Sequence, residues 1–311
     1  MKLLMKTSFV AFLVVALFVI ATGIWEAGFV VPKVRVGPLV TNMPETQNLL
    51  FFAIGDTGSG DDNQKAVASA MEDRCEKAKP DALLLLGDLD YMSGFSSLKD
   101  KDWNKKVFGM YGGPCMKTVP IYPVLGNHDY RRAPEVLIQK TEQSDRWYFP
   151  NRFYSLVFGE LLEIVAYDTN VFDFCMQKKF CSVDFMLDRL SEGTTKWKMV
   201  MGHHPLSSSS DKGHTHAGGW RGLVMMPILC DKADIYLSGH AHIMEHQALD
   251  DCRMDLFVSG AGGGSLESFA QPDENSKFAK SQFGFLELEF NYVEKAARFI
   301  ASSGEVLYET N

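Results

Sequence analysis

The sequence predicts an α/β fold in which buried strands alternate with helices around one large core. Five short apolar runs each end in a glycine, which is typical of buried strands that stop at a sharp turn. After the first run, residues 61–79 carry Val67, Ala70 and Met71 among charged residues, which indicates a helix. With 311 residues and 46% hydrophobic composition, the chain can bury such a core in one domain.

Each of the five runs is followed by glycine and then at once by a side chain that can bind a metal ion. The five junctions are Gly55-Asp56, Gly87-Asp88, Gly126-Asn127-His128-Asp129, Gly202-His203-His204 and Gly239-His240-Ala241-His242. In an open α/β sheet, ligands bind at the carboxyl ends of the strands. We therefore expect these side chains to meet at one sheet edge and to form a metal centre.

The globular domain is expected to span residues 49–311, after an extended linker at 26–48 that contains three prolines. Residues 207–219 are rich in serine, glycine and histidine and are expected to form a surface loop. Four further segments have the pattern of regular elements: helices at 134–144 and 183–190, and antiparallel strands at 283–290 and 297–300.

Residues 1–25 have the pattern of a targeting segment. Lys2 and Lys6 precede an apolar stretch at 9–20 and then small residues, which fits a cleaved secretory signal peptide. The alternative is membrane attachment through an uncleaved anchor at residues 8–25, which is barely long enough to span a bilayer. Either reading predicts that the rest of the chain is exported and is secreted, extracytoplasmic or lumenal.

The six cysteines suit an exported protein, because an even number in such a chain suggests disulfides. Cys175 and Cys181 are close enough in sequence to close a small loop, although buried free thiols are the alternative for these cysteines. The absence of a CxxC pair disfavours a zinc–thiolate site. A net charge of −8 without any basic block argues against nucleic acid as a partner.

The ligand types at the five junctions indicate which metal ions the site would hold. Carboxylate, amide and imidazole donors without cysteine suit iron, zinc or manganese rather than copper. The donors are too many for one ion with an open position. Two ions about 3.5–4 Å apart, bridged by one carboxylate, would account for them and would stabilise attack on a phosphoryl centre. The site therefore predicts hydrolysis of a phosphate ester.

The order of these motifs resembles that of the calcineurin-like metallophosphoesterases over nearly all of residues 49–245. This resemblance implies a four-layer α/β/β/α sandwich of two mixed sheets. Most members open with Asp-x-His, whereas this chain has Asp56-Thr57-Gly58 and carries Tyr91 three residues after Asp88. GDxG followed by GDxxY, GNHD, GHHP and GHxH resembles the purple acid phosphatases. The single-domain length and the segment 145–150 are most similar to the small, tartrate-resistant type.

The resemblance assigns the candidate ligands to two ions. A ferric ion would be held by Asp56, Asp88, Tyr91 and His242. A divalent iron, zinc or manganese ion would be held by Asp88, Asn127, His203 and His240, with Asp88 bridging the pair. Phenolate and carboxylates are hard donors that suit Fe(III), whereas imidazoles and an amide suit a divalent ion.

The resemblance also indicates the catalytic side chains. His128 would face the substrate and assist the leaving group, and Asp129 would orient His128. The family has a second catalytic histidine in the loop after the GHxP motif; here His214 is the first choice and His216 the second. His204 is interpreted as a neighbour of the ligands, and His246 as structural or exposed.

These assignments imply an acid phosphatase that hydrolyses phosphate monoesters by direct attack of a metal-bound hydroxide, with an acid pH optimum. The substrate would be a small phosphomonoester or a phosphoprotein, and the protein a monomer. One alternative is a calcineurin-like phosphodiesterase with two divalent ions. Another is a membrane-tethered scaffold that is catalytically silent, because a fold does not by itself establish activity.

Overall fold

The computed structural model describes residues 38–170, 182–211 and 219–310. Several predictions fall outside these ranges and are not tested by the structure. They concern the targeting segment 1–25, the Cys175–Cys181 pair, and the candidate catalytic residues His214 and His216.

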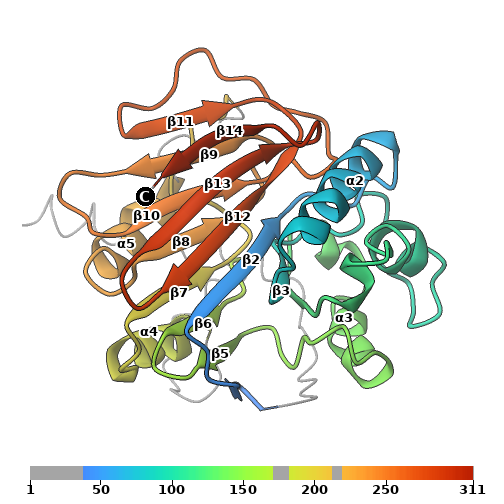
Figure 1. Cartoon of the computed structure of the whole chain (residues 1–311), viewed down its shortest axis with the longest axis horizontal. Helices are drawn as coiled ribbons and strands as arrows, with labels where there is room; N and C mark the ends of the chain where they lie inside the picture. Colours follow the sequence, from blue (N-terminus) through green and yellow to red (C-terminus); the bar gives the residue numbers. More distant parts are fainter. Residues whose placement is uncertain (1–37, 171–181, 212–218, 311) are drawn as a thin grey trace, which may run out of the picture. The chain divides into compact units, whose positions relative to one another are not determined.

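Two mixed β-sheets form the centre of the described chain (Figure 1). The larger sheet has the strand order β1 (Val40–Met43), β5 (Tyr154–Phe158), β6 (Leu162–Ala166), β7 (Trp197–Met201), β8 (Ile235–Ser238), β10 (Asp255–Ser259), β9 (Met244–Ala248), β11 (Ser276–Lys280). The smaller sheet has the order β14 (Val306–Thr310), β13 (Lys295–Ala301), β12 (Gly284–Asn291), β2 (Asn48–Ile54), β3 (Ala82–Leu85), β4 (Ile121–Pro123).

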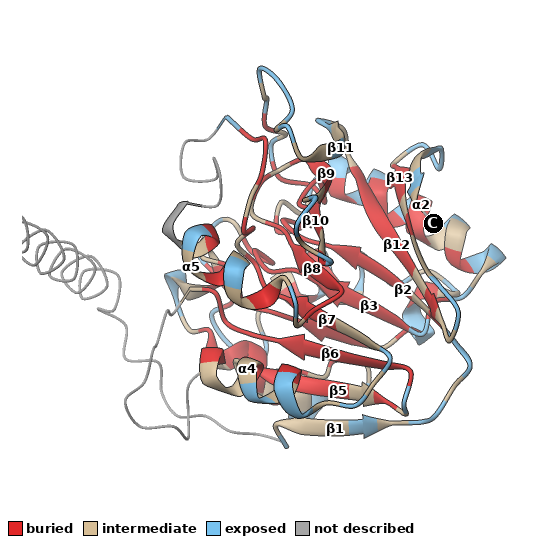
Figure 2. Cartoon of the chain, turned by 90° about the vertical axis from the view of Figure 1, so that its left-hand side faces the viewer, coloured by how far each residue is buried: buried red, intermediate tan, exposed pale blue. Residues whose placement is uncertain are grey.

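All five apolar runs that precede the metal-type residues form strands. β2, β3 and β4 are parallel neighbours in the smaller sheet, and β7 and β8 are parallel neighbours in the larger one. Their side chains are buried on both faces, which explains why they read as continuous apolar runs rather than alternating ones. Figure 2 shows most of these central strands as buried.

The inner faces of the two sheets pack against each other and form the core. Phe51 of β2 meets Phe158 of β5 edge to face, with ring centroids 5.6 Å apart. Phe257 of β10 and Phe299 of β13 make a second contact between the sheets at 6.2 Å. Because successive strand residues point to opposite faces, every second residue of each strand points to the outer face of its sheet, where a further layer can cover it.

Helices cover the outer face of the larger sheet. Met199 and Met201 of β7 belong to the core between the sheets, whereas Val200 belongs to a second apolar cluster. That cluster includes buried residues of α4 (Ser182–Glu192) and α5 (Gly219–Leu229).

Helix α2 (Asp62–Lys77) lies against the smaller sheet on its outer side (Figure 1). Asp61 caps its N-terminus by accepting hydrogen bonds from the amides of Asn63 and Gln64. Arg74 joins the helix to β12 through two hydrogen bonds to the buried carboxylate of Glu287, at 2.6 and 2.7 Å. The predicted four-layer α/β/β/α sandwich of two mixed sheets is therefore confirmed.

The other predicted elements agree with the structure in type. The segment 134–144 contains α3 (Glu135–Gln139) and a following 3-10 turn, and β12 and β13 pair antiparallel as expected. The linker prediction for 26–48 is wrong in part, because residues 40–43 form β1. Strand β1 pairs with residues 155–158 of β5 at the edge of the larger sheet. The sequence of this short edge strand has no apolar run that would have predicted it.

The prediction of a surface loop at 207–219 is wrong for its first residues. Ser208, Ser209 and Ser210 are buried, although each carries a polar side chain. The hydroxyls of Ser208 and Ser209 donate to the buried carboxylate of Glu245, and Ser210 donates to Glu267. The serines are buried because two carboxylates need donors, a requirement that composition does not reveal.

Two disulfides lie within the described residues. Cys75 pairs with Cys115, and Cys230 pairs with Cys252. Within 38–170, 182–211 and 219–310, no helix is both long and apolar enough to cross a membrane.

Candidate metal centre

The candidate ligands lie where the carboxyl ends of strands from both sheets come together. The amide of Gly55, just after β2, donates to the carbonyl of Ser259 at the end of β10 at 2.7 Å. A Cβ on Gly55 would lie 3.0 Å from the Cα of Gly239, which follows β8. The expectation of a single sheet edge is therefore corrected: three ligand-bearing strands belong to one sheet and two to the other.

Three of the candidate ligands have a left-handed backbone conformation. Asp56, Asp88 and His240 have φ values of 59°, 55° and 66°, and they are the non-glycine residues with positive φ in the described chain. This conformation is unfavourable for residues with a Cβ and is typical of functional sites, where the surrounding structure imposes it. The turns after three strands thus aim their side chains at a common point.

Glycines let the ligands approach each other closely. A Cβ on Gly264 would lie 2.5 Å from the Tyr91 hydroxyl and 2.6 Å from His242 Cε1. A Cβ on Gly126 would overlap the carboxylate of Asp88, and one on Gly239 would lie 2.6 Å from Asp56 Oδ2. Each of these glycines is required by the side chain beside it.

A first group of donor atoms contains a phenol, a carboxylate and an imidazole. The Tyr91 hydroxyl lies 3.3 Å from Asp56 Oδ1 and 3.0 Å from His242 Nε2, and these two atoms are 3.4 Å apart. Donors about 2.1 Å from one ion and at right angles to each other would be about 3.0 Å apart. The three atoms therefore have the separation expected around one metal ion.

A second group lies beside the first. Asn127 Oδ1 is 3.1 Å from both His203 Nε2 and His240 Nδ1, and the two nitrogens are 3.3 Å apart. Asp88 Oδ1 is 3.5 Å from His203 Nε2. Ligand atoms of Asp56, Asp88 and His203 lie within 4.8 Å of one another, so Asp88 is within reach of both groups.

Hydrogen bonds to carbonyl groups orient two of the histidines. His203 Nδ1 donates to the Leu86 carbonyl at 2.7 Å, and His242 Nδ1 donates to the Ser265 carbonyl at 2.7 Å. Because Nδ1 carries the proton in each ring, Nε2 presents its lone pair to the donor group. This arrangement is the one that metal-bound histidines usually have.

The electrostatics of the site favour a bound cation. Burial tends to lower the pKa of His242, but the adjacent Asp56 carboxylate outweighs burial and raises it to about 9. The same balance holds for His203: burial tends to lower its pKa, but the charges of Asp88 and Asp56 outweigh burial and raise it. Burial and the nearby Asp56 charge raise the pKa of Asp88. A metal ion would supply the positive charge for which these groups otherwise hold protons.

Asp129 has a different role from the one expected. Its carboxylate does not orient His128, but accepts hydrogen bonds from the amides of Asp88 (3.0 Å), Leu89 (3.0 Å) and Gly126 (2.8 Å). These bonds tie the turns after β3 and β4 together and support the left-handed conformation of Asp88. The GNHD pattern identified Asp129, but backbone partners cannot be read from a motif.

His128 lies at the edge of the donor groups and is partly exposed. Its Nδ1 faces the Tyr91 carbonyl at 3.3 Å, and its Nε2 is 3.8 Å from Asp88 Oδ2. Its ring also meets that of Tyr91 edge to face. This position beside the donor groups fits a residue that contacts a substrate.

His204, which the sequence predicts to be only a neighbour of the ligands, lies beside His203 and His240. Its ligand-type nitrogen lies within 4.8 Å of those of His203 and His240, so it joins the candidate ligands on geometry. Its Nδ1 lies 2.8 Å from the Thr169 hydroxyl oxygen. Of the two interpretations of His246, structural or exposed, the structure supports the first: it is buried, and its Nε2 is 3.2 Å from Asp255 Oδ1.

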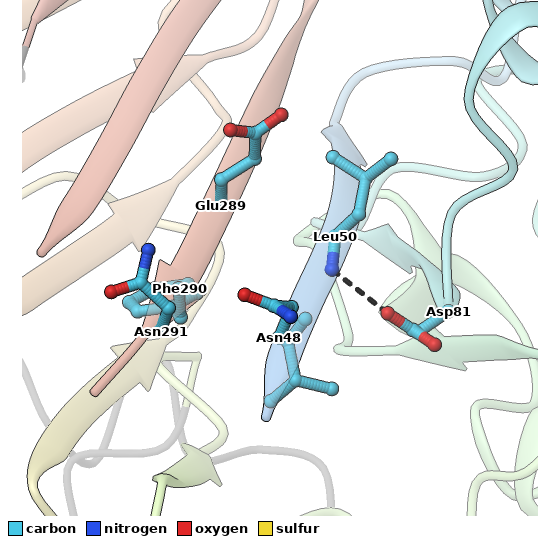
Figure 3. A pocket seen from close by; sticks show the side chains of 7 residues that line it. Asn48, Leu50, Asp81, Glu289, Phe290 and Asn291 are labelled. Carbon is cyan, nitrogen blue, oxygen red and sulfur yellow. Dashed lines mark hydrogen bonds between the residues drawn. The ribbon is translucent and has the colours of Figure 1, made fainter. Parts of the chain in front are cut away.

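A small pocket elsewhere in the domain is unrelated to this centre (Figure 3). Its lining includes Asn48 and Leu50 at the start of β2, whereas Asp56 follows the end of that strand. The two ends of a seven-residue strand are about 20 Å apart. Asp81, which Figure 3 shows beside Leu50, accepts a hydrogen bond from the Leu50 amide and so has a structural role.

The family model described as calcineurin-like phosphoesterase matches residues 49–244. Purple acid phosphatase 3 of Arabidopsis thaliana is 29% identical over 83% of this chain and 76% of its own length. Tartrate-resistant acid phosphatase type 5 of Sus scrofa is 26% identical over 92% of this chain and 93% of its own.

Among solved structures, GAP50, the anchor in the inner membrane complex of Plasmodium, has a TM-score of 0.75 at 23% identity. The match covers 86% of this chain and 89% of that one, and it shows the shared fold.

The similarity to a purple acid phosphatase and a tartrate-resistant acid phosphatase implies a dinuclear metal centre. The two donor groups described above provide candidate ligands for it. They also support a hydrolase acting on phosphate esters. The family model covers more than half of the chain, and the sandwich of two mixed sheets agrees with it. The chain therefore belongs to the calcineurin-like phosphoesterases.

Proposed function

We propose that this protein is an acid phosphatase that hydrolyses phosphate monoesters at a centre containing Fe(III) and a divalent ion. The observation that carries the proposal is the position of the Tyr91 hydroxyl, which lies 3.3 Å from a carboxylate oxygen of Asp56 and 3.0 Å from an imidazole nitrogen of His242. Burial and the charges of Asp56 and Asp88 raise the pKa of this phenol. It would ionise only beside a strongly acidic cation, and Fe(III) is such a cation.

The proposed ligands divide as the two donor groups do. Asp56, Tyr91 and His242 would hold the ferric ion, and Asn127, His203 and His240 would hold divalent iron, zinc or manganese. Asp88 would bridge the two ions. When bound, the ions would lower the pKa of a water molecule and neutralise charge on the phosphoryl oxygens.

The chain's own residues would position the ester and manage its protons. His128, beside Asp88, would contact the phosphoryl group and assist departure of the alkoxide. His214 or His216 would provide a second catalytic histidine. Transfer of the phosphoryl group would be directly to water, since no serine or cysteine directly follows the glycine at any of the five strand ends.

The ferric assignment is tested by metal analysis and the visible spectrum of the purified protein. The proposal expects two metal ions per chain and an absorption band that disappears in Tyr91→Phe. Tyr292→Phe, in a turn remote from these ligands in the sequence, is the matched control and should leave the band unchanged. A colourless protein that contains zinc alone would refute the ferric assignment.

Activity distinguishes the rival functions. The proposal expects p-nitrophenyl phosphate to be hydrolysed with an acid optimum and faster than bis(p-nitrophenyl) phosphate. A preference for the diester would instead favour a phosphodiesterase with two divalent ions. The absence of both activities in metal-loaded protein would favour a silent membrane-tethered scaffold.

We further propose that the protein is exported, monomeric and active on small phosphomonoesters or phosphoproteins rather than nucleic acid. The disulfides Cys75–Cys115 and Cys230–Cys252 support an oxidising compartment. Cell fractionation with the full chain would test the destination, and a cytosolic protein with reduced thiols would contradict it.

A further inference from the structure

Arg131 is an exposed arginine fixed at the rim of the candidate metal centre. It belongs to a 3-10 turn, Asp129–Arg131, that follows His128 directly. One guanidinium nitrogen donates to the Tyr91 carbonyl at 2.8 Å, and the other lies 3.3 Å from His128 Nε2. The guanidinium is thus attached to one proposed ferric ligand and to the proposed substrate-facing histidine.

The path from this guanidinium to the bridging carboxylate is short. His128 Nε2, which Arg131 contacts at 3.3 Å, is itself 3.8 Å from Asp88 Oδ2. A tetrahedral anion placed between the donor groups and solvent would therefore lie within reach of both His128 and Arg131. An arginine has five N–H donors, and the two contacts above leave others free for such an anion.

Arg131 also differs from the other cations of this region in its charge partners. Lys106 is paired with Asp90, and Arg152 is paired with Asp168. Among the described residues, no carboxylate lies within ion-pair distance of Arg131. Holding a long side chain with two hydrogen bonds costs conformational freedom. The two partners of Arg131, the Tyr91 carbonyl and the His128 imidazole, carry no negative charge and so do not compensate the charge of the guanidinium. The missing counter-charge is what a bound anion would provide.

We propose that Arg131 binds the phosphoryl oxygens of the substrate and favours doubly charged monoesters over singly charged diesters. This inference rests on the proposed phosphatase function and names a residue for its specificity. The planar guanidinium suits the purpose because it can donate two parallel hydrogen bonds to one phosphoryl group. A second negative charge on that group strengthens the attraction, whereas an esterified oxygen weakens it.

The test compares Arg131→Gln with the matched control Arg132→Gln. Arg132 is the next residue, is also exposed, and has no hydrogen bond to the centre within the described part of the chain. Two measurements are made on metal-loaded protein: kinetics with p-nitrophenyl phosphate and bis(p-nitrophenyl) phosphate, and calorimetric binding of inorganic phosphate.

Loss of a charge-assisted hydrogen bond should weaken monoester binding about tenfold to a hundredfold. We expect Arg131→Gln to raise KM for the monoester and Kd for phosphate by this factor, and KM for the diester by much less. Arg131→Lys should restore part of the phosphate affinity, because the charge remains but the paired donors do not. Arg132→Gln should change none of these values.

A merely structural role of Arg131 predicts a different result. If it only supports His128, then Arg131→Gln lowers kcat for both esters alike and leaves the Kd for phosphate unchanged; that outcome overturns the inference. Equal behaviour of the two glutamine variants overturns it too. If the wild type hydrolyses neither ester, the proposed function fails, and phosphate binding still decides whether Arg131 is an anion-binding residue.

Discussion

The ion pair between Lys106 and Asp90 should be essential for the stability of the loop that carries Tyr91. Lys106 Nζ lies 2.8 Å from Asp90 Oδ2, and the two side chains are only 3% and 2% exposed. Lys106 comes from a π-helical segment, Trp103–Phe108, and Asp90 directly precedes Tyr91. Lys106→Met keeps the length and apolar stem of the side chain but removes its charge.

The size of the effect follows from burial. Removing one partner of a buried ion pair leaves an uncompensated charge and costs about 3–5 kcal/mol. Asp90 keeps hydrogen bonds from the amides of Met92 and Ser93, at 2.8 and 3.1 Å, after the substitution. We therefore expect the lower end of the range, about 3 kcal/mol, which corresponds to a decrease in Tm of about 6–12 °C.

The effect should depend on pH in a defined direction. Burial raises the pKa of Asp90, but the hydrogen bond and charge of Lys106, together with hydrogen bonds from the amides of Ser93 and Met92, outweigh burial, so the folded-state pKa is lowered. The pair therefore stabilises the fold above the unfolded-state pKa of about 3.9, and its contribution is lost as the pH falls through the lower folded-state pKa. The stability difference between wild type and Lys106→Met should be constant from about pH 5 to 8 and shrink in stronger acid.

Urea unfolding at several pH values measures this difference, with Lys105→Met as the control on the same helical segment. Lys105 is exposed, and its loss should change the free energy of unfolding by less than about 0.5 kcal/mol. The reasoning is refuted if Lys106→Met is no more destabilising than Lys105→Met. It is also refuted if the difference persists unchanged well below pH 3.

Three further effects are expected. Gly126→Ala places a Cβ on the Asp88 carboxylate, so metal content should fall sharply; full metal content would contradict this account of the glycine. Replacing Cys75 and Cys115 by alanine opens a loop closed over 40 residues and should lower the free energy of unfolding by about 4 kcal/mol in urea titrations. Burial raises the pKa of Asp255, but hydrogen bonds from His246 and Lys295 lower it overall. Asp255→Asn should therefore destabilise the fold by about 1 kcal/mol near pH 7 and not near pH 3; an equal loss at both pH values would exclude this linkage.

The layers of the fold and the gathering of the ligands could be predicted from the sequence because both depend on local patterns. Buried parallel strands read as apolar runs, and each run ends in glycine before a ligand, so β2, β3, β4, β7 and β8 were all expected. The resemblance to a known family then supplied the second sheet. Strand β1 could not be predicted, because a partly exposed edge strand has neither alternation nor an apolar run.

The errors within the site have a different origin. Asp129 and Ser208–Ser210 are fixed by partners that are distant in sequence or belong to the backbone. A motif gives the type of a side chain and its neighbours along the chain, but not the amide or carboxylate that it meets after folding. The same limit hid Arg131, whose significance lies in its contacts with Tyr91 and His128.

The costs built into the centre explain why its ligands occur together. Left-handed conformations at Asp56, Asp88 and His240 cost about 1–3 kcal/mol each, and burial of two neighbouring carboxylates adds to this. A bound cation would offset the charges, and its binding free energy would also stabilise the strained turns. Without a cation, the backbone strain of Asp56, Asp88 and His240 would not be offset by a ligand. Their joint presence is therefore a stronger argument for metal binding than any single motif.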